Sequence, residues 1–216
     1  MTFISRRDLL KAAAIVPFAR GFQSGARPPV ENLTATEMEL LDAIVARLIP
    51  TDANGPGATE ALAAHYIDHA LGTALASSRP AYAAGLAALD RYARSSRGAP
   101  FTQLSATDQD SVLIDVETGA ASGFTGSAAA FFAMVLSHTH QGTFGDPYYG
   151  GNANFVGWDL IAYPGVRTMV TATDQKSLES KALKPNHKSA YEYDFIKDNE
   201  RGRGPASLGK RDHHGD

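Results

Sequence analysis

Cysteine is absent from the 216 residues of this sequence. Without it the chain can form no disulfide, thiolate metal site, iron–sulfur cluster or C-x-x-C-H haem attachment. The sequence also lacks a G-x-S-x-G elbow, a P-loop and a G-x-G-x-x-G turn after a strand, which are the usual motifs of hydrolases, nucleoside triphosphatases and dinucleotide-binding enzymes. These absences leave the chain without a recognisable catalytic motif.

Positive charge is scarce in the central part of the chain. Residues 31–174 hold six Lys and Arg against fifteen Asp and Glu, whereas residues 1–30 hold five against one and residues 175–216 hold nine against seven. Proteins that bind duplex nucleic acid draw much of their affinity from Lys and Arg on phosphates. The acidic body therefore argues against a nucleic-acid partner.

Bulky side chains are also few, because the chain has 1 Trp, 8 Tyr and 10 Phe against 36 Ala. With 44% hydrophobic and 20% charged residues, the composition is that of a soluble globular protein. The length favours one domain at about 150 residues per domain. Alanine is the best helix former and aromatic residues prefer strands, so the composition favours an all-α fold.

Helix start and stop signals divide residues 31–174 into segments. Leu33, Thr34, Glu37 and Met38 predict a capping box and a hydrophobic staple at the start of a helix that ends before Pro50. The same signals predict four further helices: about Thr59–Ala76, Pro80 to Arg97, Ser105 to near Gly119, and about Ser127–Gln141. The sequence therefore predicts an all-α helical bundle of about five helices.

Residues 1–30 have the outline of an export signal and linker. Arg6 and Arg7 open a basic segment, an apolar run follows over residues 12–19, and Ala19 and Ala26 are both candidate ends of the signal. The paired arginines after Ser5 resemble the twin-arginine consensus. The apolar run is shorter than the about twenty residues that span a bilayer. The alternative is a basic amphipathic helix on a cytosolic protein.

The segment Gly142–Gly165 departs from the helical pattern. It has six Gly, two Pro and six aromatic residues, among them the single Trp, in 24 residues. A long loop in a compact domain usually serves function or a partner, and its aromatics resemble interface anchors. The alternative is a loop that caps its own helices. The candidate partner-binding residues are Asp146, Pro147, Tyr148, Tyr149, Gly150, Gly151, Asn152, Gly157, Trp158, Tyr163, Pro164 and Gly165.

Residues 175–216 form a polar tail of mixed charge with few apolar residues. Such a composition predicts an extended segment that is either disordered or laid across another protein. The helical domain, 31–174, therefore lies between the export signal and an extended tail.

Two histidines, His65 and His69, lie four residues apart on the expected second helix and so share one face. They could bind one metal ion, but no third ligand is evident, and a polar helix face is the favoured interpretation. His138 and His140 are two residues apart, so they point to different faces and cannot readily chelate one ion.

The loop and the leader resemble the gluconate 2-dehydrogenase subunit 3 family, over about residues 5–166. The resemblance rests on the motifs Gly142-Thr143-Phe144-Gly145-Asp146-Pro147, Tyr149-Gly150-Gly151-Asn152, Gly157-Trp158 and Ile161-Ala162-Tyr163-Pro164-Gly165. Two residues depart from the expected pattern: Gln141 stands where an acidic residue is usual, and Ala162 where Gly is usual.

The resemblance implies a non-catalytic small subunit that holds no cofactor or metal itself. Its partner is an FAD-dependent sugar or polyol dehydrogenase of the glucose-methanol-choline type, often joined by a cytochrome c subunit. The small subunit is expected to support folding and twin-arginine export of the flavoprotein to the periplasm, and to reach the membrane only through the complex. Two alternatives stay open: a helical periplasmic metalloenzyme that uses His65 and His69, and a stand-alone binding protein.

Overall fold

The computed structural model describes residues 28–193. Arg6 and Arg7 of the predicted signal and residues 194–216 of the predicted tail lie outside this range. The described residues form five short 3-10 helices, no strand and seven α-helices: α1 (Ala35–Leu48), α2 (Ala63–Leu71), α3 (Arg79–Arg97), α4 (Ala106–Glu117), α5 (Ala128–Phe144), α6 (Val156–Leu160) and α7 (Ala172–Glu179). The all-α prediction is confirmed. None of these helices is long and apolar enough to cross a membrane.

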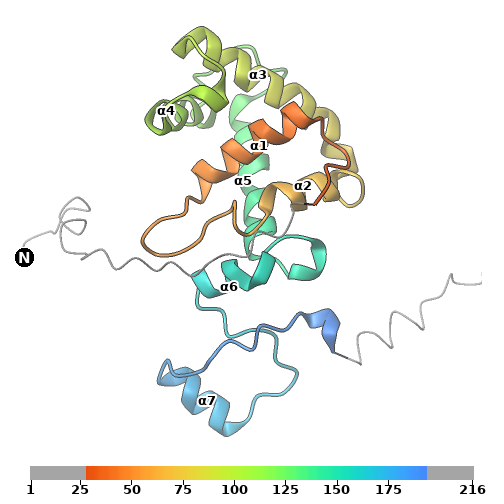
Figure 1. The fold of residues 1–216 in the computed structure, drawn as a ribbon, viewed down its shortest axis with the longest axis vertical. Helices are drawn as coiled ribbons and strands as arrows, with labels where there is room; N and C mark the ends of the chain where they lie inside the picture. The colour runs from red at the N-terminus through yellow and green to blue at the C-terminus, as the bar shows by residue number, and fades with distance from the viewer. Residues whose placement is uncertain (1–27, 194–216) are drawn as a thin grey trace, which may run out of the picture.

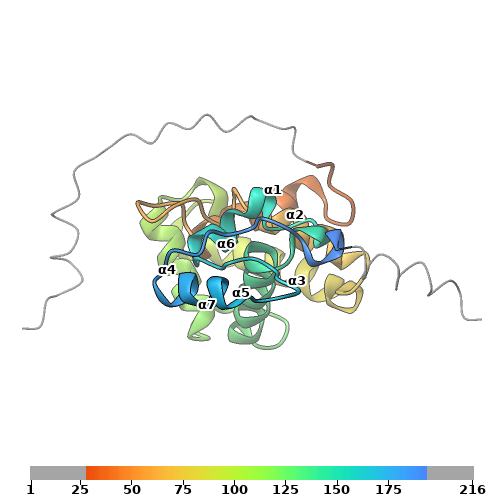
Figure 2. The same cartoon turned by 90° about the horizontal axis from the view of Figure 1, so that it is seen from below.

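Helix α5 runs through the middle of the bundle and contacts each of α1 to α4 (Figure 1). Helix α6 lies at one end of the bundle, and α7 lies beyond it, at the opposite end of the long axis from α3 and α4. Seen from that end, α7 and the chain after it lie in front of the bundle (Figure 2). The molecule therefore has a helical body and a C-terminal extension at one end.

The core of the body is made of aliphatic side chains around a few aromatic rings. Tyr82 and Phe101 are fully buried. The Tyr82 ring meets Phe131 edge-on at 6.3 Å and stacks on His138 at 5.9 Å between ring centroids. Gly85 faces Phe131 so closely that a Cβ atom would stand 2.2 Å from its ring. Small residues on α3 thus let α5 bring its aromatics into the centre.

The predicted helix starts at Thr34, Ser105 and Ser127 are confirmed. Thr34 and Glu37 form both halves of the capping box, with hydrogen bonds of 3.2 and 2.8 Å. Ser127 accepts from the Ala130 N–H, and Ser105 from the Asp108 N–H. These bonds satisfy backbone donors that a first helical turn leaves without partners.

Two helix lengths differ from the prediction. Helix α2 covers Ala63–Leu71 rather than about Thr59–Ala76, because Leu62 before it is left-handed, with φ of 57°, and Gly72 caps its end. Helix α5 continues to Phe144 instead of ending at Gln141, since Gly142 packs on α2 where a Cβ atom would stand 2.9 Å from the Ala63 Cα. Close helix packing outweighs the weak helix propensity of glycine here.

Asp68 fixes the chain that enters α1. Its buried carboxylate accepts hydrogen bonds from the backbone N–H groups of Glu31, Asn32 and Leu33, at 2.6, 2.9 and 2.7 Å. Because charge-assisted bonds to backbone donors are strong, one side chain of α2 orders the start of the domain.

Candidate functional site

The glycine-rich loop is anchored where α5 meets α2. The Asn152 N–H donates to the Gly142 carbonyl at 2.6 Å, and the Ala153 N–H donates to the Ala61 carbonyl at 3.2 Å. Gly151 lies so close that a Cβ atom there would stand 2.2 Å from the Gly142 oxygen. Gly151 thus permits a close backbone approach between the loop and α5 within the chain.

Asn152 holds the inside of the loop together. It is fully buried with a φ of 44°. Its side-chain amide donates to the Gly145 carbonyl at 2.8 Å and accepts from the Gly157 N–H at 2.8 Å. A Cβ atom on Gly157 would stand 1.8 Å from the Thr143 oxygen, so only glycine fits there. Asn152 and Gly157, two of the predicted partner-binding residues, are thus enclosed by their own chain.

Trp158, another of the predicted partner-binding residues, is also buried within its own chain. Only 4% of it is exposed. Its indole Nε1–H donates to the Phe144 carbonyl at 2.9 Å, at the end of α5, and its ring meets Phe155 at 5.2 Å and Tyr163 edge-on at 4.9 Å. The polar and apolar parts of the indole are thus both engaged inside the chain. At this residue the loop caps its own helices.

The exposed part of the loop is the turn that follows Asp146. Tyr148 and Tyr149 lie on the 3-10 helix Pro147–Tyr149 and are 56% and 49% exposed. The Asp146 carboxylate accepts from the Tyr148 N–H at 3.0 Å and fixes the start of the turn, and Gly150 ends it with a φ of 91°. The turn from Asp146 to Gly150 therefore presents two aromatic rings at the surface.

The chain after α7 folds back onto this turn. Ser189 Oγ donates to the Asp146 carboxylate at 2.6 Å, and the Ala190 N–H donates to its other oxygen at 2.9 Å. The Tyr191 ring stacks on Tyr148 at 3.9 Å, and its hydroxyl is hydrogen-bonded to that of Tyr149. Tyr148, Tyr149 and Tyr191 together form the tyrosine cluster. Residues 186–193 therefore pack against the glycine-rich loop of the same chain. Helix α7 is a second difference from the predicted extended tail.

The end of the loop is covered in the same way. Tyr163 is 36% exposed, beside Trp158. The Pro164 carbonyl accepts from the Asn186 N–H at 3.3 Å, and Gly165, with a φ of 84°, is buried against the Asn186 side chain. His187 Nε2 lies 2.6 Å from the Asp159 carboxylate. Of the twelve predicted residues, the tyrosines keep the largest exposed faces.

The His65–His69 pair lines a cavity of about 190 Å³ beside the tyrosine cluster. His69 Nδ1 lies 3.0 Å from Glu31, while the Asp68 oxygens are taken by the three backbone donors described above. Among residues 28–193 no group of three or more His, Asp or Glu side chains is placed to hold a metal ion. The nearby carboxylates serve backbone and ion-pair contacts.

Tyr66, on the same helix, borders the tyrosine cluster. It shares a second cavity, of about 230 Å³, with Tyr148 and Tyr149. Burial, together with the neighbouring Tyr149 phenol, raises the pKa of Tyr66. Its hydroxyl therefore stays protonated and donates to Gln141 at 3.0 Å. Two cavities therefore lie on the α2 side of the tyrosine cluster.

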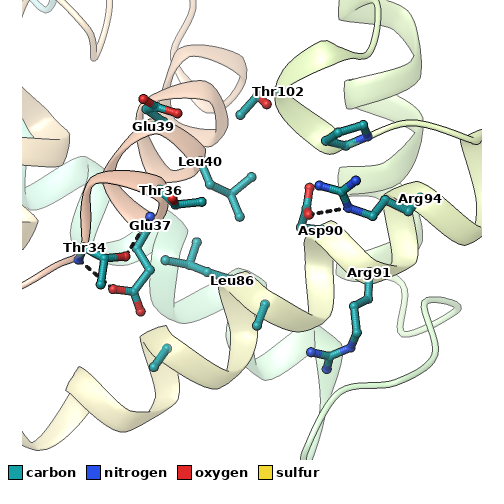
Figure 3. Close-up of a pocket in the computed structure, with 13 residues that line it drawn as sticks. Thr34, Thr36, Glu37, Glu39, Leu40, Leu86, Asp90, Arg91, Arg94 and Thr102 are labelled. Carbon is teal, nitrogen blue, oxygen red and sulfur yellow. Dashed lines mark hydrogen bonds and ion pairs between the residues drawn. The ribbon is translucent and has the colours of Figure 1, made fainter.

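A larger groove, of about 470 Å³, lies between α1 and α3 (Figure 3). Leu40 and Leu86 form its apolar floor. Glu37 is held by Thr34 and Arg79. Burial of the Glu37 carboxylate raises its pKa, but the hydrogen bonds that it accepts from Thr34 and Arg79 outweigh burial and lower the pKa below its ordinary value. Asp90 is paired with Arg94 at 2.8 Å. The groove offers mainly apolar contact, since these carboxylates are already engaged.

Sequence reasoning missed Ser189 and Asp68. Ser189 begins a Ser-x-x-Glu capping box with Glu192, a local signal that could have indicated ordered structure in the tail. Asp68 had no such signal, because its partners lie more than thirty residues away in the sequence.

The sequence of the chain matches the model of one protein family. The family model described as gluconate 2-dehydrogenase subunit 3 matches residues 35–165, from the start of α1 to the end of the glycine-rich loop. No curated protein and no solved structure matches the chain significantly. The match covers well over half of the chain and includes Tyr148 and Tyr149, but ends before α7 and Tyr191.

Proposed function

Because the chain belongs to the gluconate 2-dehydrogenase subunit 3 family, we propose that it is the non-catalytic small subunit of an FAD-dependent sugar or polyol dehydrogenase of the glucose-methanol-choline type. The family name makes it a subunit of a dehydrogenase complex. In this proposal the large subunit holds the FAD and oxidises the substrate, and a cytochrome c subunit can receive the electrons. The small chain supports folding, export and stability of the flavoprotein.

The observation that carries the proposal is the tyrosine cluster, in which the exposed Tyr148 and Tyr149 lie on the family-matched loop. Two tyrosines that are about half exposed lie next to each other, and the Tyr191 ring stacks on Tyr148 and meets Tyr149 edge-on. Tyrosine is enriched among the residues that contribute most to protein–protein binding, because it combines a large apolar face with a hydroxyl at low cost in rotamer entropy. A large subunit that covers this cluster would bury apolar surface that water now contacts.

The proposed location follows from the leader. Arg6 and Arg7 resemble a twin-arginine signal, and that pathway carries folded cargo, so the small subunit and its flavoprotein can cross to the periplasm together. The complex would then lie at the periplasmic side of the membrane.

One co-expression experiment tests the docking surface. A tagged large subunit is produced with the wild-type chain, with the Tyr148→Ala/Tyr149→Ala variant, or with Ile114→Ala, an exposed apolar residue on α4 at the far end of the bundle. Loss of about 2 kcal/mol at a central interface tyrosine corresponds to about thirtyfold weaker binding. We expect that loss for the double variant and none for the control.

Two results would overturn the proposal in distinguishable ways. Equal capture of all three forms would show that the tyrosine cluster is not the docking surface. If the wild-type chain captures no flavoprotein at all, it is not a subunit of such a complex. In the same cells, Arg6→Lys/Arg7→Lys should keep the flavoprotein out of the periplasm, and normal periplasmic levels would refute shared export.

A further inference from the structure

Residues 166–185 form a closed arm that carries α7. The Val166 carbonyl accepts from the Asn186 side chain at 2.5 Å and from the Tyr193 hydroxyl at 2.6 Å, and Arg167 donates to the Lys184 carbonyl at 2.9 Å. These bonds hold the two ends of the arm side by side. The arm begins just past the family match, and it lies at the end of the molecule's long axis (Figure 1). It is therefore an ordered addition to the family domain.

The arm exposes apolar side chains that nothing in the described chain covers. Met169 is 77% exposed, Val170 63% and Leu178 54%, and α7 has no buried residue. Helix α7 has 8 residues, and helices shorter than about twelve residues are only marginally stable in water without packing. A surface that covers α7 would therefore stabilise it. Seven of the nine large apolar residues that are exposed in the described chain lie between residues 148 and 178, so exposed apolar side chains are concentrated in the glycine-rich loop and the arm.

The charge of the arm is opposite to that of the body. Residues 166–185 hold four Lys and Arg against two acidic residues, whereas residues 28–165 hold five against fourteen. Arg167 and Asp174 face each other at 3.7 Å. The remaining cations, Lys176, Lys181 and Lys184, are all exposed. An anionic surface would attract the arm and repel the body, and would so orient the long axis.

We propose that the arm contacts an anionic phospholipid bilayer directly, with Met169 and Val170 entering the headgroup region and the three lysines near the lipid phosphates. An arm with exposed apolar side chains and three exposed lysines, joined to an acidic body, matches the charge and polarity of such a surface. Lysine is depleted in protein–protein interfaces, whereas its long apolar stem suits a membrane interface. The inference does not depend on the flavoprotein partner.

The lack of cysteine allows a site-specific test in the full chain. Met169→Cys and, as control, Ile114→Cys are each labelled with the environment-sensitive dye NBD and mixed with vesicles of phosphatidylglycerol and phosphatidylcholine, or of phosphatidylcholine alone. We expect a blue shift at residue 169 with anionic vesicles only, weakened by salt, and none at residue 114. Because the dye reports its own surroundings, any attachment through the basic leader does not produce the signal at residue 169.

Charge variants supply the second readout. Each lysine near an anionic surface strengthens partitioning about fivefold, equivalent to about 1 kcal/mol. The triple variant Lys176→Gln/Lys181→Gln/Lys184→Gln should therefore bind anionic vesicles about 100-fold more weakly, as measured by the NBD shift at residue 169. Arg91→Gln, an exposed cation on α3, should leave it unchanged. No shift at residue 169 with anionic vesicles overturns the proposal. A shift produced by the purified large subunit without lipid also overturns it, and would assign the arm to protein docking.

Discussion

Replacing Trp158 by alanine tests whether the glycine-rich loop is part of the fold or a detachable docking element. The indole is 4% exposed and fills the space between Phe155, Tyr163 and the end of α5. If this arrangement is intact in the free subunit, Trp158→Ala must destabilise the subunit itself. If the loop instead becomes ordered only when it binds a partner, the substitution will not change the unfolding free energy of the free subunit.

The size of the effect follows from the contacts. Truncation of a buried Trp or Phe to Ala costs about 3–5 kcal/mol, through lost burial and the cavity that remains. Trp158 packs in a small cluster apart from the main core, so the lower end, about 3 kcal/mol, applies. The Phe144 carbonyl also loses its indole donor. For a domain of this size, that loss lowers the melting temperature by about 6–12 °C.

Urea unfolding followed by circular dichroism measures the change. With a slope of about 2 kcal/mol per molar urea, the midpoint should fall by about 1.5 M. Tyr148→Ala is the control, because that ring is 56% exposed and surface substitutions cost about 0.5 kcal/mol or less. Trp158 is the single Trp of the chain, so its fluorescence in the wild-type protein reports on the loop alone. An unchanged midpoint for Trp158→Ala, or a wild-type indole that acrylamide quenches freely, would refute the reasoning.

The predicted helix starts are right where the signal is local. The cap at Thr34 needs only Glu37 three residues on, and a single sequence displays both. The helix ends are less predictable because tertiary contacts set them. Gly142 reads as a helix stop in the sequence, but it permits the close approach of α5 to Ala63, and the helix continues through it.

The position of the candidate site in the sequence was predictable, but the burial of its side chains was not. The clustering of glycine and aromatic residues locates the loop, yet the sequence does not tell which rings face inward. Contacts inside the loop decide this, such as the hydrogen bonds of the Asn152 amide to Gly145 and Gly157 and the bond from the Trp158 indole to the Phe144 carbonyl. The tail was misjudged for a related reason, because its polar composition hides the few residues, such as Ser189 and Tyr191, that fasten it to Asp146 and Tyr148.

Two further predictions concern buried polar groups. Asp68→Ala leaves three backbone N–H groups without their acceptor, so it should cost about 3 kcal/mol or more in urea unfolding, while Asp68→Asn, which keeps one acceptor oxygen, should cost less. His138 is buried, with Nδ1 3.0 Å from the Tyr82 hydroxyl, and burial lowers its pKa below the ordinary value of 6.5. The unfolded chain then binds this proton more readily than the folded one, so the stability that the neutral ring contributes is complete above pH 6.5 and is lost as the pH falls through the lower folded pKa. His138→Gln can still bond to Tyr82 but does not titrate, so its unfolding free energy should fall less than that of the wild type as the pH is lowered from 6.5, and parallel pH profiles would show that His138 does not carry this dependence.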